Sequence, residues 1–151
     1  MPVTIDELLS LVRQGNSTGR NMQWQASENA VFLKIETGTY ANHRGDHTLI
    51  GQIRLIGGGW GISIEAPSAF HVPQDARGPI SEFCLRKQME MPLIRFALDE
   101  SDGELRPVVQ QVLGDESLDQ LRLSVLLMAM IGACEELGAV IQGTGPSLGE
   151  D

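Results

Sequence analysis

The sequence predicts a single α+β domain in the order helix, antiparallel strands, helix, β-hairpin, helix. Three observations predict it: a capping box before an amphipathic run near the N-terminus, short segments in which apolar and polar residues alternate, and a long apolar run near the C-terminus. The 151 residues are 42% hydrophobic and show neither a Pro/Ser-rich linker nor an internal repeat. We therefore place one domain over residues 1–142 and a disordered tail over residues 143–151.

The first predicted helix covers residues 5–14. Thr4 and Glu7 have the spacing of a capping box, in which the threonine hydroxyl accepts from the third amide of the helix and the glutamate reaches back to the cap. Leucines and a valine follow at helical spacing. The turn-forming residues 15–19 are expected to end the helix.

Four strands are predicted in the first half of the chain. Period-two alternation indicates the first, and a β-branched and aromatic run indicates the second; the residues between them favour a hairpin. A polar loop over residues 38–47 follows. Two further strands turn on three consecutive glycines, Gly57–Gly59. The four predicted strands are residues 22–26, 31–35, 48–56 and 60–65.

Residues 67–78 contain two prolines and few periodic apolar positions, which predicts an exposed crossover. Pro79 is expected at the first position of a second helix, over residues 79–90, because a proline there removes no intrahelical hydrogen bond. One face of this helix would carry four side chains: Ile80, Phe83, Cys84 and Met91.

Asp102-Gly103 between two apolar runs is the strongest hairpin signal in the chain and predicts strands over residues 93–98 and 104–112. Ser117 and Gln120 offer a second capping box, before a final helix that is expected to continue to about residue 137 and to stop at Gly138.

The final helix is apolar around most of its circumference, more than the stripe of about 100° that one core contact needs. Its apolar stretch between Arg122 and Glu135 spans twelve residues, 123–134, whereas a bilayer crossing needs roughly 20. We therefore expect a homodimer in which one helix face packs the core and the other packs a second copy; which face does which stays open. The predicted interface residues are Leu123, Leu126, Leu127, Met130 and Ile131.

The charge of the chain is −9, with 11 basic and 20 acidic residues. This balance argues against nucleic acid and anionic membrane surfaces as partners, because both require clustered cations. Cys84 and Cys134 are too few for a disulfide framework, and the N-terminus has no secretory pattern, so we expect a cytoplasmic protein.

Three side-chain groups are candidates for other chemistry. His43 and His47 have a spacing that can hold a transition metal, and four carboxylates around one turn can attract calcium. His71, in the crossover, is the candidate centre of a small enzyme pocket. Since no catalytic motif accompanies any of them, we expect no cofactor and no enzymatic activity, and keep a calcium- or zinc-binding acidic regulator and a small enzyme as alternatives. The four carboxylates belong to Asp99, Glu100, Asp102 and Glu104.

Residues 80–137 resemble the bacterial YbjN-type sensory-transduction regulators, which share the fold of type III secretion chaperones. The features that carry the resemblance are a helix running into "PLIRFALDE", the turn "SDGE", a second strand, the acidic "DESLDQL" and a final apolar helix. The resemblance implies an α+β domain, commonly a homodimer, that binds another protein rather than transforming a small molecule. Secretion chaperones wrap an extended segment of an effector around their surface.

Overall fold

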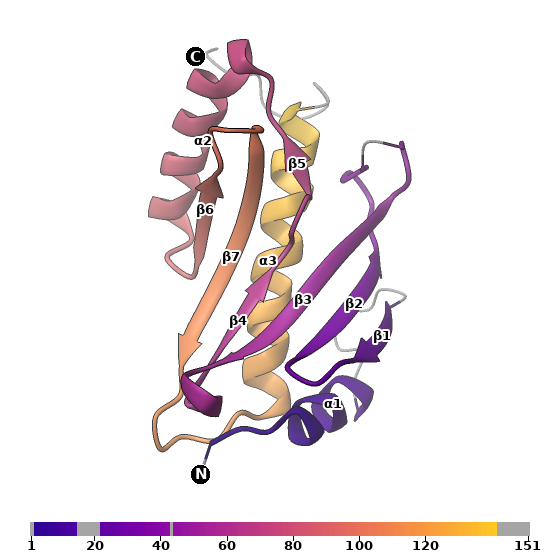
Figure 1. Cartoon of the computed structure of the whole chain (residues 1–151). Coiled ribbons are helices and arrows are strands. Elements are labelled where there is room, and N and C mark those ends of the chain that lie inside the picture. Colours follow the sequence, from indigo (N-terminus) through magenta and orange to yellow (C-terminus); the bar gives the residue numbers. More distant parts are fainter. Residues whose placement is uncertain (1, 15–21, 43, 142–151) are drawn as a thin grey trace.

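The computed structural model describes residues 2–14, 22–42 and 44–141, which form three α-helices and one seven-stranded antiparallel sheet (Figure 1). Two short 3-10 helices, at Gly57–Gly59 and Gln74–Ala76, join some of these elements. The elements in chain order are α1 (Ile5–Gln14), β1 (Met22–Ala26), β2 (Ala30–Glu36), β3 (Thr48–Ile56), β4 (Gly61–Glu65), β5 (Phe70–His71), α2 (Arg77–Glu90), β6 (Ile94–Leu98), β7 (Glu104–Val112) and α3 (Gln120–Ile141).

The sheet begins at β1, continues through β2, β3 and β4 to β7, and ends at β6 on the far side of β7. β4 pairs with the C-terminal half of β7 and β5 with its N-terminal end. Pro107 in β7 lies opposite the break between β4 and β5, where its carbonyl accepts from the amide of Ala66 at 3.2 Å. A proline is tolerated in this interior strand because no ladder bond needs its missing N–H at the break.

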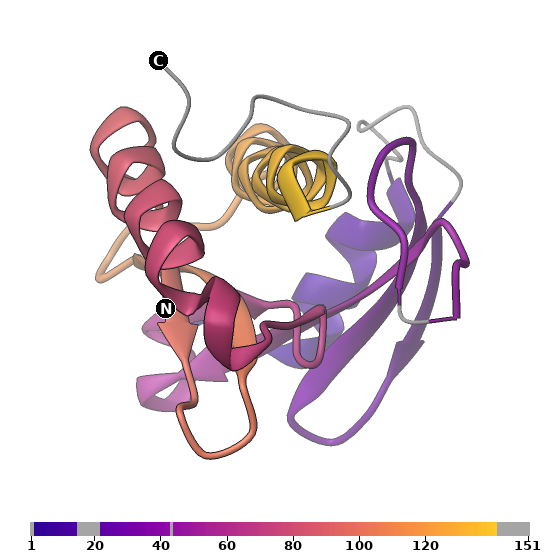
Figure 2. The same cartoon turned by 90° about the horizontal axis from the view of Figure 1, so that it is seen from above.

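All three helices cover the same face of the sheet, with α3 lying across its middle (Figure 2). Alternate side chains of the strands point toward these helices, which produces a two-layer core. The sheet contributes Leu33, Ile35, Leu49, Ile53, Ile62, Ile64, Ile94 and Val109 to this core, and the helices contribute Leu8, Ile80, Cys84, Leu123, Met130 and Leu137.

Most of the predicted elements are confirmed, and the α+β order is as expected. The amide of Glu7 donates to Thr4 Oγ1 at 3.1 Å, as the capping box requires. The glycines at 57–59 and Gly103 adopt positive φ angles at their turns, a region that side-chain-bearing residues rarely enter. The predicted turn at 15–19 and the predicted tail at 143–151 lie outside the described residues.

The crossover over residues 67–78 was predicted to be exposed, and this holds for half of its residues but not for its centre. Phe70 and Val72 are buried, and Phe70 belongs to β5, which pairs with β7. The second helix also begins earlier than predicted, at Arg77, so that Pro79 is its third residue. Proline is accommodated there because none of the first amides of a helix has an intrahelical acceptor.

Both predicted ends of the last helix are corrected. Asp119 caps it, because its Oδ1 accepts from the amide of Arg122 at 2.8 Å, and the helix continues through Gly138 to Ile141. Gly138 allows close packing rather than ending the helix, because a Cβ at this position would lie only 3.0 Å from the Cα of Tyr40. With 22 residues, α3 is long and apolar enough to cross a membrane by length and composition, and more than half of its most apolar window is buried against the rest of the chain.

Candidate protein-binding surfaces

The five side chains predicted to face a second copy are buried within the single chain. Each is at most 4% exposed and belongs to the core between α3 and the sheet. The sheet and the neighbouring helices together bury a larger part of the circumference of α3 than the single stripe that one packing contact would bury. Leu123, Leu126, Leu127, Met130 and Ile131 are therefore core residues here, and as folded they offer no surface to a partner.

A different stripe of α3 is exposed. Leu121, Val125 and Met128 are 74%, 49% and 55% exposed, and they follow one another at steps of four and three residues, so they lie along one side of the helix. Gly132, four residues further on, continues the same line. In the sequence, Val125, Met128 and Gly132 belong to the same apolar run as the buried residues, and only the packing separates the exposed stripe from the buried side.

An apolar groove of about 300 Å³ adjoins the first half of this stripe. It lies between α3 and the sheet, and Leu93, Leu121 and Val125 contribute partly exposed apolar surface to it. Asp119 and Arg122 stand among its polar lining, and Arg122 Nη1 donates to Glu116 Oε2 at 2.6 Å. Such an apolar floor with a charged rim is typical of a protein contact surface.

Hydrogen bonds from within the chain occupy most of the outward amides of the β6 edge. Asp99 and Glu104 close the β6–β7 hairpin by a hydrogen bond, so the alternation of an antiparallel pair turns the amides of Ile94, Phe96 and Leu98 outward. Two of these three have acceptors: the carbonyl of Met91 at 3.1 Å for Ile94, and the side chain of Gln88 at 2.9 Å for Phe96.

The β1 edge is open within the described residues. The amide of Ser27 donates to the carbonyl of Ala30 at 2.8 Å, and this bond sets the phase of the β1–β2 ladder. By the same alternation, the N–H and C=O groups of Met22, Trp24 and Ala26 point away from β2. Trp24, opposite the buried Leu33, lies at the rim of the helix-covered face and is 39% exposed.

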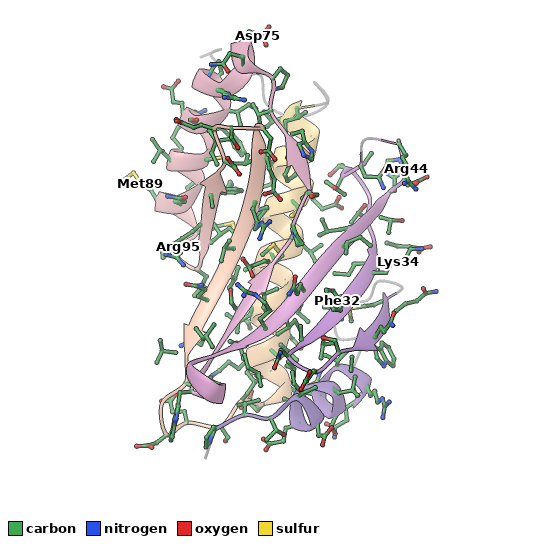
Figure 3. All side chains as sticks on the ribbon, viewed as in Figure 1. Phe32, Lys34, Arg44, Asp75, Met89 and Arg95 are labelled. Atoms are coloured by element: carbon green, nitrogen blue, oxygen red, sulfur yellow. The ribbon has the colours of Figure 1, made fainter. Side chains whose placement is uncertain are left out.

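The sheet face opposite the helices carries exposed apolar side chains near this edge. Phe32 and Lys34 project from β2 on that face (Figure 3), and Phe32 and Ile50 are 40% and 45% exposed. Further across the face, Glu65 accepts from Arg54 at 2.7 Å and lies 3.7 Å from Arg106. Its carboxylate is thus already matched by cations from two neighbouring strands.

The loop between β2 and β3 is fixed to α3 by one carboxylate. Glu135 accepts from the amides of Gly38, Thr39 and Tyr40 at 2.8, 2.9 and 2.6 Å. In the same loop, Nδ1 of His47 donates to the carbonyl of Tyr40 at 2.9 Å. His43, its predicted metal partner, lies outside the described residues, so the structure does not describe the predicted pair.

The acidic turn has its own intrachain partners. Asp99 accepts from the backbone and hydroxyl of Ser101, and these bonds hold the pKa of Asp99 below its usual value. Asp102 accepts from the amide of Glu104, whose own carboxylate binds Arg106 at 3.1 Å and the amide of Ser68 at 2.6 Å. Among the described residues, no three His, Cys, Asp or Glu side chains are grouped to hold a metal ion.

His71 lines an apolar pocket of about 170 Å³ between the crossover and the end of α3. Its described lining is otherwise apolar: Val72, Pro73, Ala76, Ile80, Val140 and Ile141. Neither cysteine lies in that lining. Burial raises the pKa of the Cys84 thiol to about 12, and it also raises the pKa of the Cys134 thiol. Among the described lining residues, His71 therefore has no nucleophile or second acid-base group beside it.

No protein-family model matches this sequence, and comparison with curated proteins finds no match. The resemblance to the YbjN-type regulators therefore stays a prediction.

Proposed function

We propose that the protein is a non-enzymatic protein-binding module, chaperone-like or regulatory, that acts as a homodimer and captures an extended segment of another protein at β1. The observation that carries this proposal is the contrast between the two sheet edges. Side-chain and backbone acceptors occupy two of the three outward amides of β6, whereas the outward groups of β1 have no partner among the described residues. Proteins commonly protect an edge strand, because an unprotected one is a template for pairing with another chain.

A segment added beside β1 would gain main-chain hydrogen bonds from three residues. Met22, Trp24 and Ala26 each turn an N–H and a C=O toward the open edge, as the ladder phase requires. Such bonds provide affinity for any extended peptide, and pockets beside alternate side chains provide selectivity. Trp24 on one face and Phe32 on the other are the exposed apolar side chains available to give that selectivity.

Three observations support a binding role over catalysis. Both thiols are buried and held protonated, His71 has no described acid-base group beside it, and three of the four carboxylates of the acidic turn already accept hydrogen bonds within the chain. The same observations give no support to the cation-binding alternative or to an enzyme at His71. The charge of −9 further favours protein partners in the cytoplasm over nucleic acid or membrane surfaces.

Ala26→Pro tests the edge. The substitution removes one outward N–H and places the proline ring away from β2, while Ala26→Ser keeps the N–H and serves as the matched control. The partner would be the protein that co-purifies with the full chain from its native host, rebound to each purified variant by calorimetry.

We expect Ala26→Pro to weaken that binding about three- to tenfold through the loss of one hydrogen bond and the blocked edge. Ala26→Ser should bind as the wild type does. Equal affinity of two folded variants, or amide exchange protection by the partner at residues outside 22–26 only, would refute capture at β1.

A further inference from the structure

Gly132 has no structural reason to be glycine within the described chain. It lies inside α3, where glycine costs about 1 kcal/mol relative to alanine. Its φ is not positive, and among the described residues no atom lies within 4 Å of the position that a Cβ would take. Gly138 differs, because the backbone of Tyr40 packs against it. Gly132 is thus a notch on the outer side of α3, open to whatever packs there.

The notch continues the stripe of exposed apolar side chains. Val125 lies seven residues before Gly132, and Met128 lies between them, so the bulky part of the stripe ends in the notch. If two such stripes pack antiparallel about a two-fold axis near Met128, Val125 of each helix lies opposite Gly132 of the other. This pairing places a branched side chain against each notch and brings the helices close together.

The charges beside the stripe match under the same symmetry. Arg122 lines the groove with Leu93, at the start of β6, and Glu136 forms an ion pair with Lys87 of α2, the helix that leads to β6. Both charges therefore lie on the flank of α3 that faces α2 and β6. A two-fold axis perpendicular to α3 places this flank on the same side of the dimer in both copies and reverses the direction of the helix. The N-terminal end of one α3 therefore lies beside the C-terminal end of the other, and Arg122 approaches Glu136 of the second copy.

We propose that a second copy of this chain packs on the α3 stripe, antiparallel, with Val125 opposite Gly132 and Arg122 beside Glu136 across the two-fold axis. This inference rests on the homodimer of the proposed function and specifies its interface. Figure 2 shows α3 almost end-on, with the sheet to one side of it. The β1 edge lies away from this stripe, beyond β2, and stays available to an extended partner (Figure 1).

Site-specific cross-linking tests the register. In the full chain, Met128→Cys places a thiol near the two-fold axis, and a short bismaleimide should link two copies in high yield. The matched control is Leu121→Cys, on the same stripe, whose thiols would be about 22 Å apart along the helix axis in the proposed register. Cys84 and Cys134 are buried, so the wild type should give no product.

A second variant separates the interface from the fold. Gly132→Leu fills the notch without meeting any described atom of its own chain, so it should leave the thermal unfolding midpoint of the monomer unimpaired and yet weaken dimerisation at least tenfold. Arg122→Glu and Glu136→Arg should each weaken the dimer about tenfold, since each reversal disrupts two symmetry-related pairs, and the double reversal should restore it.

The outcomes distinguish the two levels of the proposal. A wild-type chain that sediments as a monomer throughout the micromolar range would overturn both the homodimer and this interface. A dimer that links through Leu121→Cys but not Met128→Cys, or that Gly132→Leu leaves intact, would overturn the interface alone. A monomer whose stripe binds only the helix of a different protein would also refute the second copy as its occupant.

Discussion

Tyr40→Phe removes one buried hydroxyl and should change both the stability of the fold and its dependence on pH. The Tyr40 side chain is buried, its hydroxyl donates to the carbonyl of Ala69 at 2.8 Å, and its ring meets Phe70 edge-on at 5.3 Å. Phenylalanine keeps the ring contact and leaves the Ala69 carbonyl without this donor. At neutral pH, the free energy of unfolding should fall by about 1–3 kcal/mol.

Burial raises the pKa of Tyr40 from its ordinary 10.0 to about 12. Because the folded state holds this proton more tightly than the unfolded state, the corresponding stability is fully present below pH 10 and is lost as the pH rises toward 12. At about pH 11 the wild type should have lost roughly 1.4 kcal/mol through this residue alone. Tyr40→Phe cannot lose it, so the gap between the two proteins should shrink by that amount.

Urea unfolding at neutral pH and near pH 11, followed by far-UV circular dichroism, measures this gap. Alkaline loss through the buried Cys84 affects both proteins and cancels in the comparison. A gap that stays constant across the two pH values would show that Tyr40 titrates at its ordinary pKa when folded, and the burial of its hydroxyl would then be refuted.

Three further experiments test the packing of α3, the docked loop and the β6 edge. Leu123→Ala should lower the free energy of unfolding by about 2–5 kcal/mol, because it empties a core position. Leu121→Ala, on the exposed stripe, should change the free energy of unfolding of the monomer by less than about 0.5 kcal/mol. Urea unfolding of both variants, at a protein concentration that dissociates any dimer, gives the comparison. Glu135→Ala removes the acceptor of three consecutive amides and should lower stability by about 2 kcal/mol, with faster amide exchange at residues 38–40; unchanged exchange there would argue against this anchor. Gln88→Ala frees the outward amide of Phe96 and should increase aggregation on storage, as light scattering would record.

Much of the fold follows from local patterns that the sequence displays directly. The capping box at Thr4, the glycines at 57–59 and the Asp102-Gly103 turn each fix a backbone geometry within a few residues, and each is found as predicted. The turns between neighbouring strands likewise predicted three of the strand pairings. Such features are predictable because their physical cause lies between neighbours in the chain.

The errors came from packing between distant segments. Gly138 looks like a helix stop, yet it is retained inside α3 because Tyr40, almost a hundred residues earlier, packs against it. The crossover looked polar, yet Phe70 and Val72 are buried against the rest of the core. Nothing within either local pattern specifies the distant segment that covers it.

The same limit explains the candidate interface. The apolar excess of the last helix was recognised and its partner-facing side was left open, but the residues named for the interface, such as Leu127, are buried in the chain's own core, while Leu121, Val125 and Met128 are exposed. The spacing of these three at i, i+4 and i+7 was present in the sequence. It could be distinguished from the core stripe only after the sheet had been placed against α3.

Sedimentation equilibrium of the full chain at micromolar concentrations, beside Gly132→Leu, tests the central claim of a homodimeric binding module most directly. The account predicts the mass of two chains for the wild type and the mass of one for the variant, with equal or higher thermal stability of the variant monomer. A wild type that keeps the mass of a single chain at every concentration would contradict it.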